Sequence, residues 1–275
     1  GVSLFLELAV IRWQGTVFEF FAFYKNLGLL CAFAGLGLGY ALASRKHVPL
    51  FLTVPLLAFQ MLLMIALRHG LGWKYIESMM VTPFPEQLNM GYRVATSAYN
   101  YVAVYCFVAV IFFMTAMAFV PVGQLCGRLM KRRENLRAYS WNLLGSLAGV
   151  LLSFAASYLQ TGPVIWFALS FAAILVFQAF ETRGLVTAAV FAIVGLIVLA
   201  FPVSSEWLSI YSPYQLIERG PGGNGQVCLK AAGHYYQRIL DLSRERVAAS
   251  EDPFDKYTAK YYEFPYRVYG KPAKV

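Results

Sequence analysis

Charged residues are scarce in this chain of 275 residues. Asp, Glu, Lys and Arg together make up 13% of it, whereas 59% of its residues are hydrophobic. Soluble domains carry about 25% charged residues and about 45–50% apolar ones. The mean hydropathy is +0.57, and the excess comes from long apolar runs before residue 203. Runs of this kind are typical of transmembrane helices and exclude an ordinary soluble domain over this part of the chain.

Histidine and cysteine are rare as well. The sequence has 3 His and 4 Cys, and no two cysteines form a CxxC or another paired spacing. Zinc sites and disulfide frameworks need such spacings, so we predict neither, and no other metal site. The net charge of +9 raises the question of nucleic acid, but the sequence lacks a basic aromatic surface or a finger motif. We therefore predict no nucleic-acid partner.

The apolar residues fall into seven segments: 1–13, 18–44, 48–67, 98–122, 138–159, 163–180 and 184–202. Segment 98–122 has room to extend past Pro121 to Met130. The first segment is shorter than the roughly 20 residues of a membrane span, and no basic leader precedes it, so we interpret it as a cut helix and not as a signal peptide. We predict a mainly α fold: a polytopic helical bundle over residues 1–202, in the inner cell membrane, with the lipid bilayer as its partner.

Basic residues cluster in two loops. Arg45 and Lys46 follow the second segment, and residues 128–137 contain five Lys or Arg between the fourth and fifth segments. The positive-inside rule places both loops in the cytoplasm. Counting crossings from there puts residues 203–275 on the outer side.

Four charged residues lie in or near the first two segments: Glu7, Arg12, Glu19 and Lys25. Charges at membrane depth are costly, so they are usually paired or face a cavity. One interpretation is an intramembrane polar site or an ion pathway. The other is a structural ion pair, or side chains that extend to the membrane interface.

Glycines recur in the second and fifth segments. Gly35 and Gly39 are four residues apart with Gly37 between them, and Gly145 and Gly149 are also four residues apart. The first run resembles a dinucleotide-binding loop, but no strand precedes it and it lies in an apolar helix. We therefore predict close helix–helix packing at these glycines.

The last part of the chain, residues 203–275, has a different character. We predict strands over 216–219, 226–230 and 234–242, with a glycine-rich hairpin turn over 220–225. A helix should run from Pro253 to Glu263 and stop before Pro265. The result is a small β meander plus a helix. It is near the lower size limit for an independent core, so we expect it to pack on something else.

Several short motifs occur in order along this part. Tyr214-Gln215 precedes a strand, residues 233–237 read Gly-x-x-x-Gln, and Tyr261-Tyr262-Glu263 follows in the helix. In this order they resemble motifs of the aminopropyltransferases, the spermidine synthases, and in particular their membrane-fused relatives. The membrane part is similar to these fused proteins too, with Glu7 and Arg12 in the first helix and a glycine-rich second helix.

The resemblance implies a β-rich lid ahead of a Rossmann-like catalytic domain. It implies decarboxylated S-adenosylmethionine and a polyamine such as putrescine as substrates, with Gln215, Gln237, Tyr261 and Tyr262 as substrate-binding residues. Tyr262 stands where the family usually has His or Gln. The glycine-rich nucleotide loop and the catalytic aspartate loop are not among these 275 residues. We therefore expect no catalytic residue, no bound cofactor and no activity in this chain by itself, and a Rossmann-like domain as its partner.

Two alternatives and two questions stay open. The chain could be part of a major-facilitator-like transporter with a polar site near Glu7 and Arg12, although no internal repeat is evident. It could also be a membrane scaffold without a ligand. A homo-oligomer is left open. Because the substrates implied by the resemblance are cytosolic, the resemblance implies a cytoplasmic tail, against the crossing count.

Overall fold

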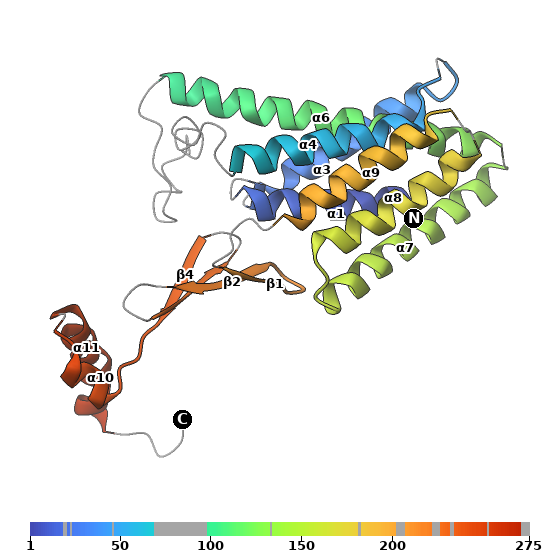
Figure 1. The fold of residues 1–275 in the computed structure, drawn as a ribbon. Coiled ribbons are helices and arrows are strands. Elements are labelled where there is room, and N and C mark those ends of the chain that lie inside the picture. The colour runs from blue at the N-terminus through green and yellow to red at the C-terminus, as the bar shows by residue number, and fades with distance from the viewer. Residues whose placement is uncertain are drawn as a thin grey trace.

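The computed structural model describes residues 1–18, 21–22, 24–45, 47–68, 98–132, 134–180, 183–201, 207–221, 226–231, 234–251 and 253–270. Within these residues the chain is mainly helical, and a helical bundle is followed by a sheet and two further helices (Figure 1). The bundle contains α1 (Val2–Val17), α3 (Lys25–Ala41), η1 (Leu50–Leu52), α4 (Thr53–Arg68), α6 (Ala98–Lys131), α7 (Asn135–Tyr158), α8 (Pro163–Ala179) and α9 (Leu185–Ala200).

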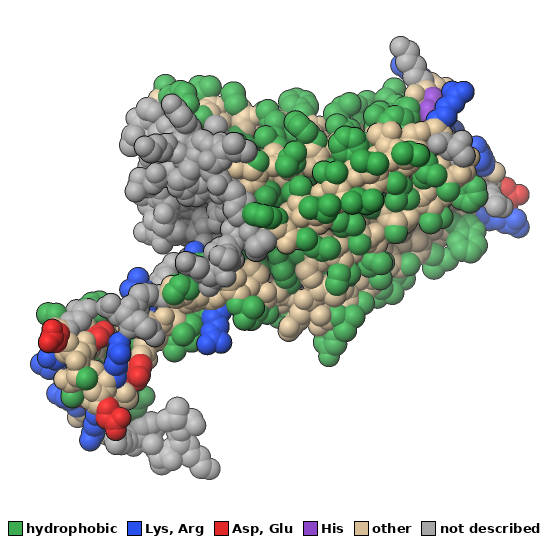
Figure 2. Space-filling view, viewed as in Figure 1, with side chains coloured by type: hydrophobic (Ala, Val, Ile, Leu, Met, Phe, Trp, Pro, Cys, Tyr) green, Lys and Arg blue, Asp and Glu red, His purple; other side chains and the backbone are tan. Residues whose placement is uncertain are grey.

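Three stretches of helix are long and apolar enough to cross a membrane: Leu50–Leu67, Tyr105–Lys131 and Asn135–Tyr158. Helices α8 and α9 are apolar but shorter. The outer side of α7 exposes leucines such as Leu144, Leu147 and Leu151, and Figure 2 shows hydrophobic side chains over the visible face of the bundle. In water such a face would be unfavourable, whereas lipid covers it without cost. The predicted mainly helical fold is confirmed, and the three long apolar helices are candidate membrane spans, as expected of a membrane protein.

The predicted glycine packing is found between α3 and α6. A Cβ atom on Gly35 would collide with the carbonyl oxygen of Ala116, and one on Gly39 with that of Val120. From the opposite helix, Gly123 lies against the backbone of Leu36. Gly37 points away from this contact and has nothing within 4 Å. Small residues let the two backbones approach each other, which is how helices associate where no hydrophobic driving force exists.

We expect Gly35→Ala to destabilise the bundle by about 1–3 kcal/mol, because the added methyl group has to push two helix backbones apart. The matched control is Gly37→Ala on the same helix, which should be neutral or slightly stabilising because that position is open. Unfolding of both variants in detergent micelles, followed by circular dichroism, compares them. Equal loss of stability in both variants would contradict the packing role of Gly35.

One helix boundary differs from the sequence-based expectation, and another follows the longer of the two expected bounds. The second segment was expected to begin at Phe18, but Phe18 has an extended backbone and α3 begins only at Lys25. Glu19 lies outside the described residues. Helix α6 continues through Pro121 to Lys131, as its sequence allowed. A proline inside a membrane helix is tolerated because neighbouring groups can satisfy the freed carbonyl.

The two ends of the bundle differ in charge. One end holds Arg45 after α3, Arg128 and Lys131 at the end of α6, and Arg137 in the first turn of α7. These basic side chains gather at the right-hand end in Figure 2, and the sheet lies toward the opposite end. Contacts agree with the picture, because the sheet touches the turn between α7 and α8, where Tyr211 lies against Gly162. We call these the basic end and the sheet end.

The sheet has four antiparallel strands in the order β1-β2-β3-β4: β1 (Leu208–Tyr211), β2 (Leu216–Pro221), β3 (Val227–Ala231) and β4 (His234–Ile239). The three predicted strands are present. The prediction missed β1, which pairs with β2 from Leu208 opposite Arg219 to Tyr211 opposite Leu216. It has only four residues, and the pairing with β2 defines them as a strand.

Two helices follow the sheet, α10 (Arg244–Ala249) and α11 (Pro253–Tyr269). The expected stop before Pro265 is wrong, since α11 continues through this proline for another turn. Proline removes one helical hydrogen bond. The carbonyl that loses its partner belongs to the exposed Tyr261, so water can take the place of the missing N–H.

Candidate functional site

Polar side chains are buried inside the bundle at membrane depth. Gln14 of α1 and Gln60 of α4 each donate a hydrogen bond of 2.9 Å to the hydroxyl of Thr115 on α6. That hydroxyl donates in turn to the carbonyl oxygen of Ile111, at 2.8 Å. Each of the three side chains is at most 1% exposed. This network connects three helices and fully uses the Thr115 hydroxyl, so we assign it a structural role.

Glu7 is different because it has no hydrogen-bond partner among the described residues. Its side chain is 2% exposed, and its Oε1 atom accepts no hydrogen bond from any described residue. Of the alternatives left open for the charged set, an ion pair between Glu7 and Arg12 is absent from the described part of the chain. Lys25, the other described member of the charged set, is exposed at the start of α3, where its ammonium group can reach the membrane interface.

Arg12 instead joins the bundle to the sheet. Its guanidinium group donates hydrogen bonds to the hydroxyl of Ser157 at the end of α7 and to the backbone carbonyl of Ser212, just after β1. It also lies 4.4 Å from the ring centre of Trp166 on α8. Trp166 in turn meets Tyr211 edge to face, with ring centroids 5.7 Å apart. One cation therefore holds α1, α7, α8 and the sheet together. We call Arg12, Ser157, Trp166, Tyr211 and Ser212 the junction.

Burial at the junction raises the pKa of Tyr211. The nearby Glu218 carboxylate raises it further, whereas the guanidinium of Arg12 opposes the shift. The phenol is therefore neutral at physiological pH and can serve as an apolar ring and a hydrogen-bonding group. The sequence had marked Arg12, but the role of Tyr211 and Trp166 had no sequence signal beyond their aromatic character.

A hollow of about 760 Å³ lies between β4 and α11. Three of the four residues assigned to substrate by resemblance line it: Gln237 from β4, and Tyr261 and Tyr262 from α11. The two tyrosines stack edge to face, with centroids 5.7 Å apart. The other lining residues are Arg238, Leu240, Phe254, Tyr257 and Thr258. We call this space the aromatic hollow. Sequence analysis missed Phe254 and Tyr257. Phe254 precedes Thr258 by four residues and Tyr257 precedes Tyr261 by four, which places each pair on one helix face.

Gln215 does not reach the aromatic hollow. It lies exposed in the turn between β1 and β2, where its backbone bonds to the hydroxyl of Ser212. Gln237 pairs with Leu229, which pairs with Arg219. Counted from Gln215, Gln237 therefore lies two strands away across the sheet, or about 10 Å. It also lies four residues away along the strand direction, or about 13 Å. The fold places Gln215 beside the junction, and a small ligand cannot touch both glutamines.

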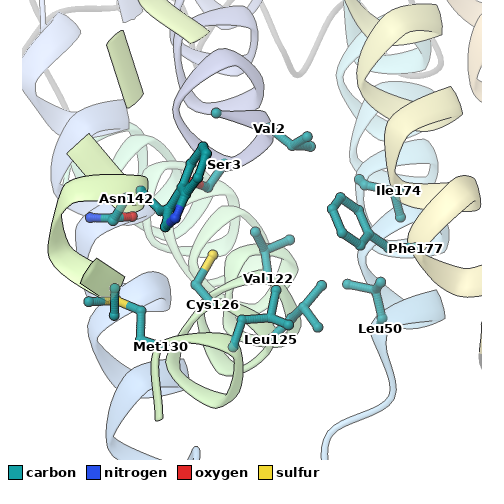
Figure 3. A pocket seen from close by; sticks show the side chains of 14 residues that line it. Val2, Ser3, Leu50, Val122, Leu125, Cys126, Met130, Asn142, Ile174 and Phe177 are labelled. Carbon is teal, nitrogen blue, oxygen red and sulfur yellow. The ribbon is translucent and has the colours of Figure 1, made fainter. Parts of the chain in front are cut away.

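A second space, of about 570 Å³, opens at the basic end between α1, α6, α7 and α8 (Figure 3). Its lining is mostly apolar, with Val122, Leu125 and Cys126 of α6 facing Ile174 and Phe177 of α8. Ser3 and Asn142 add two polar side chains. We call it the basal hollow. None of the residues predicted to bind substrate lies in it.

Among the described residues, no group of three or more His, Cys, Asp or Glu side chains is placed to hold a metal ion. The cysteines are all free thiols. Comparison of the chain with protein-family models, with curated proteins and with solved structures finds no match.

Proposed function

We propose that this chain is the membrane module and ligand-binding lid of a protein resembling the membrane-fused aminopropyltransferases. The bundle crosses the membrane seven times, with α1, α3, α4, α6, α7, α8 and α9 as the crossings. The sheet and α11 form the lid. The proposal is supported by one observation above all: Gln237 from β4 and the adjacent Tyr261 and Tyr262 from α11, all assigned to substrate by the resemblance, line the same hollow.

The chemistry of the aromatic hollow favours one of the two implied substrates. Its lining has four aromatic rings, one amide, one guanidinium group and no carboxylate. Aromatic faces stack on a nucleobase, and the amide of Gln237 can bond to its edge. A polyamine would need carboxylates, and Arg238 would repel it. The hollow therefore suits the adenosyl part of decarboxylated S-adenosylmethionine better than it suits putrescine.

The test is binding of 5′-methylthioadenosine, the nucleoside that remains after aminopropyl transfer, to the purified chain. Tyr261→Ala should weaken binding about tenfold, because one stacked ring contributes about 1–3 kcal/mol. The control is Tyr269→Ala on the same helix, which lies 89% exposed and outside the hollow. Calorimetry measures both variants. Absence of nucleoside binding, or equal weakening in both variants, would contradict the proposal and favour a protein interface on α11.

Aminopropyl transfer itself is not part of this proposal for the 275 residues. It requires an amine nucleophile that is deprotonated and aligned with a sulfonium carbon. The aromatic hollow offers no carboxylate to accept that proton, so we expect no turnover by these 275 residues. An assay with putrescine and decarboxylated S-adenosylmethionine, compared with a boiled control, measures this. Turnover above the control would show that the chain is complete for catalysis.

Transport is a second candidate, and Glu7 is the observation that favours it. Intramembrane carboxyl groups without a partner mark ion or proton pathways in many transporters. A non-catalytic scaffold would have no need for such a group. The lid and the transport functions are not exclusive, because Glu7 lies in the bundle and the aromatic hollow lies in the sheet domain.

A further inference from the structure

We infer that Glu7 is a proton-binding site inside the bundle, loaded from the basic end through the basal hollow. The inference goes beyond the ligand-binding role of the aromatic hollow and does not depend on it. It starts from the carboxyl group of Glu7 in the middle of an apolar helix. No group in the described part of the chain donates a hydrogen bond to its Oε1 atom.

No described side chain on the helices around Glu7 serves as its counter-ion. Arg12 on the same helix is engaged at the junction. The charged side chains on the helices that pack against α1 all lie toward helix ends: Lys25 begins α3, Arg68 ends α4, and Arg128, Lys131 and Arg137 lie at the basic end. Helix α8 has no titratable side chain, and the remaining titratable groups on these helices are cysteine thiols and tyrosine phenols. None of the described ones bonds to Glu7.

A carboxylate in such a place would be an unpaired buried charge. Burial of an isolated ion costs far more than burial of a neutral polar group, and a buried acid avoids this cost by taking up a proton. The structure offers no cation in place of that proton. The ligand of this site is therefore the proton itself.

The arrangement of α1 suggests how the proton arrives. Ser3, Glu7 and Gln14 fall within about 40° of one another around a helix of 3.6 residues per turn, so they share one face. Ser3 lines the basal hollow, and Glu7 lies one turn, or about 6 Å, deeper. Figure 3 shows Ser3 and Cys126 among the side chains of this hollow.

A second unsatisfied group lies at a similar depth. Thr53, the first residue of α4, is fully buried and its hydroxyl has no hydrogen-bond partner among the described residues. It follows Leu50 by three residues, and Leu50 lines the basal hollow. Two unsatisfied polar groups therefore lie just beyond the inner end of a space that opens at the basic end. Beyond them, the Gln14, Gln60 and Thr115 network closes the path toward the sheet end.

Infrared spectroscopy of the purified chain in lipid nanodiscs at neutral pH tests the site directly. We expect the carbonyl stretch of a protonated carboxylic acid in the unmodified chain and its loss in Glu7→Gln, which keeps the shape of the side chain. Glu7→Asp should shift the band, and Glu134→Gln, at an exposed carboxylate, should leave it unchanged. Glu19→Gln is a further comparison. Absence of the band, or its persistence in Glu7→Gln, would overturn the proposal.

The route is tested by the rate at which the same band shifts in heavy water. Filling the basal hollow with Cys126→Trp should slow this shift at least several-fold, whereas Cys106→Trp, at an exposed position on the same helix, should not. Circular dichroism verifies that both variants are folded. An unchanged rate in Cys126→Trp would refute loading through the basal hollow.

Discussion

Arg12→Met is expected to release the sheet from the helical bundle. The substitution removes two hydrogen bonds from a charged donor and one cation–ring contact. It leaves the Ser157 hydroxyl and the Ser212 carbonyl without this donor. Hydrogen bonds to charged groups contribute about 1.5–3 kcal/mol each, so we expect a local loss of about 3 kcal/mol at the junction.

Hydrogen–deuterium exchange measures this loss. Peptides that contain β1 should exchange roughly 100-fold faster in Arg12→Met, because every 1.4 kcal/mol changes the opening equilibrium tenfold. Helix peptides of α3 and α6, which do not touch Arg12, should keep their rates. Unchanged exchange of β1 would show that the sheet is held by other contacts.

Two further variants serve as a control and as a comparison that keeps the charge. Arg137→Met removes another arginine, but one whose partner Glu134 and own side chain are both more than three-quarters exposed. Exposed pairs contribute about 0.2–1 kcal/mol, so β1 should be unaffected. Arg12→Lys keeps the charge but loses the planar fork that serves two acceptors, so we expect an intermediate rate. Equal effects of Lys and Met would indicate that the fork, and not the charge, holds the junction.

The second large effect concerns the side of the membrane on which the sheet lies. We expect a thiol at position 214 to react with a membrane-impermeant reagent in spheroplasts, and one at position 136 to react only after lysis. Tyr214 is 90% exposed on the sheet and Leu136 is 79% exposed at the basic end. Each variant is made in a chain whose four cysteines are replaced. Cys228 itself is 7% exposed, so it would report poorly.

The expectation depends on one helix. Helix α7 has 24 residues, is long enough to span, and runs from the basic end to the turn that touches the sheet. If α7 crosses, the sheet and the basic loop lie on opposite sides, whatever α8 and α9 do. The positive-inside rule then puts the sheet outside the cytoplasm. The resemblance to cytosolic enzymes had implied a cytoplasmic tail.

Each labelling outcome has a definite meaning. Reaction at position 214 alone supports the outer location, and a cytosolic donor could then not reach the aromatic hollow. Nucleoside binding by the lid would remain measurable, so the ligand-binding proposal is tested separately from the side of the membrane. Reaction at position 136 alone would restore the cytoplasmic tail and refute our assignment. Equal reaction at both positions would show that α7 does not separate them. Labelling of denatured samples controls for thiol reactivity.

The helical bundle could be predicted from sequence because its signal is local. Long apolar runs must form helices in lipid, whatever their neighbours are, since each backbone polar group has to be satisfied within its own segment. The glycines at positions 35 and 39 predicted a close helix contact for a similar reason. The start of α3 at Lys25 and not at Phe18 had no such signal, because the apolar composition runs on from residue 18 to residue 24.

The amino-acid sequence was enough to predict a helical membrane chain with a small β-rich end, and it singled out Glu7, Arg12, Gln237, Tyr261 and Tyr262. The contacts that these residues make depend on the tertiary structure. It separated Glu7 from Arg12, brought Gln237 to the two tyrosines, and kept Gln215 away from them. Helix and strand periodicity are properties of residues that are close together in the sequence. The contacts described above join segments up to 200 positions apart, so they form only when the whole chain packs.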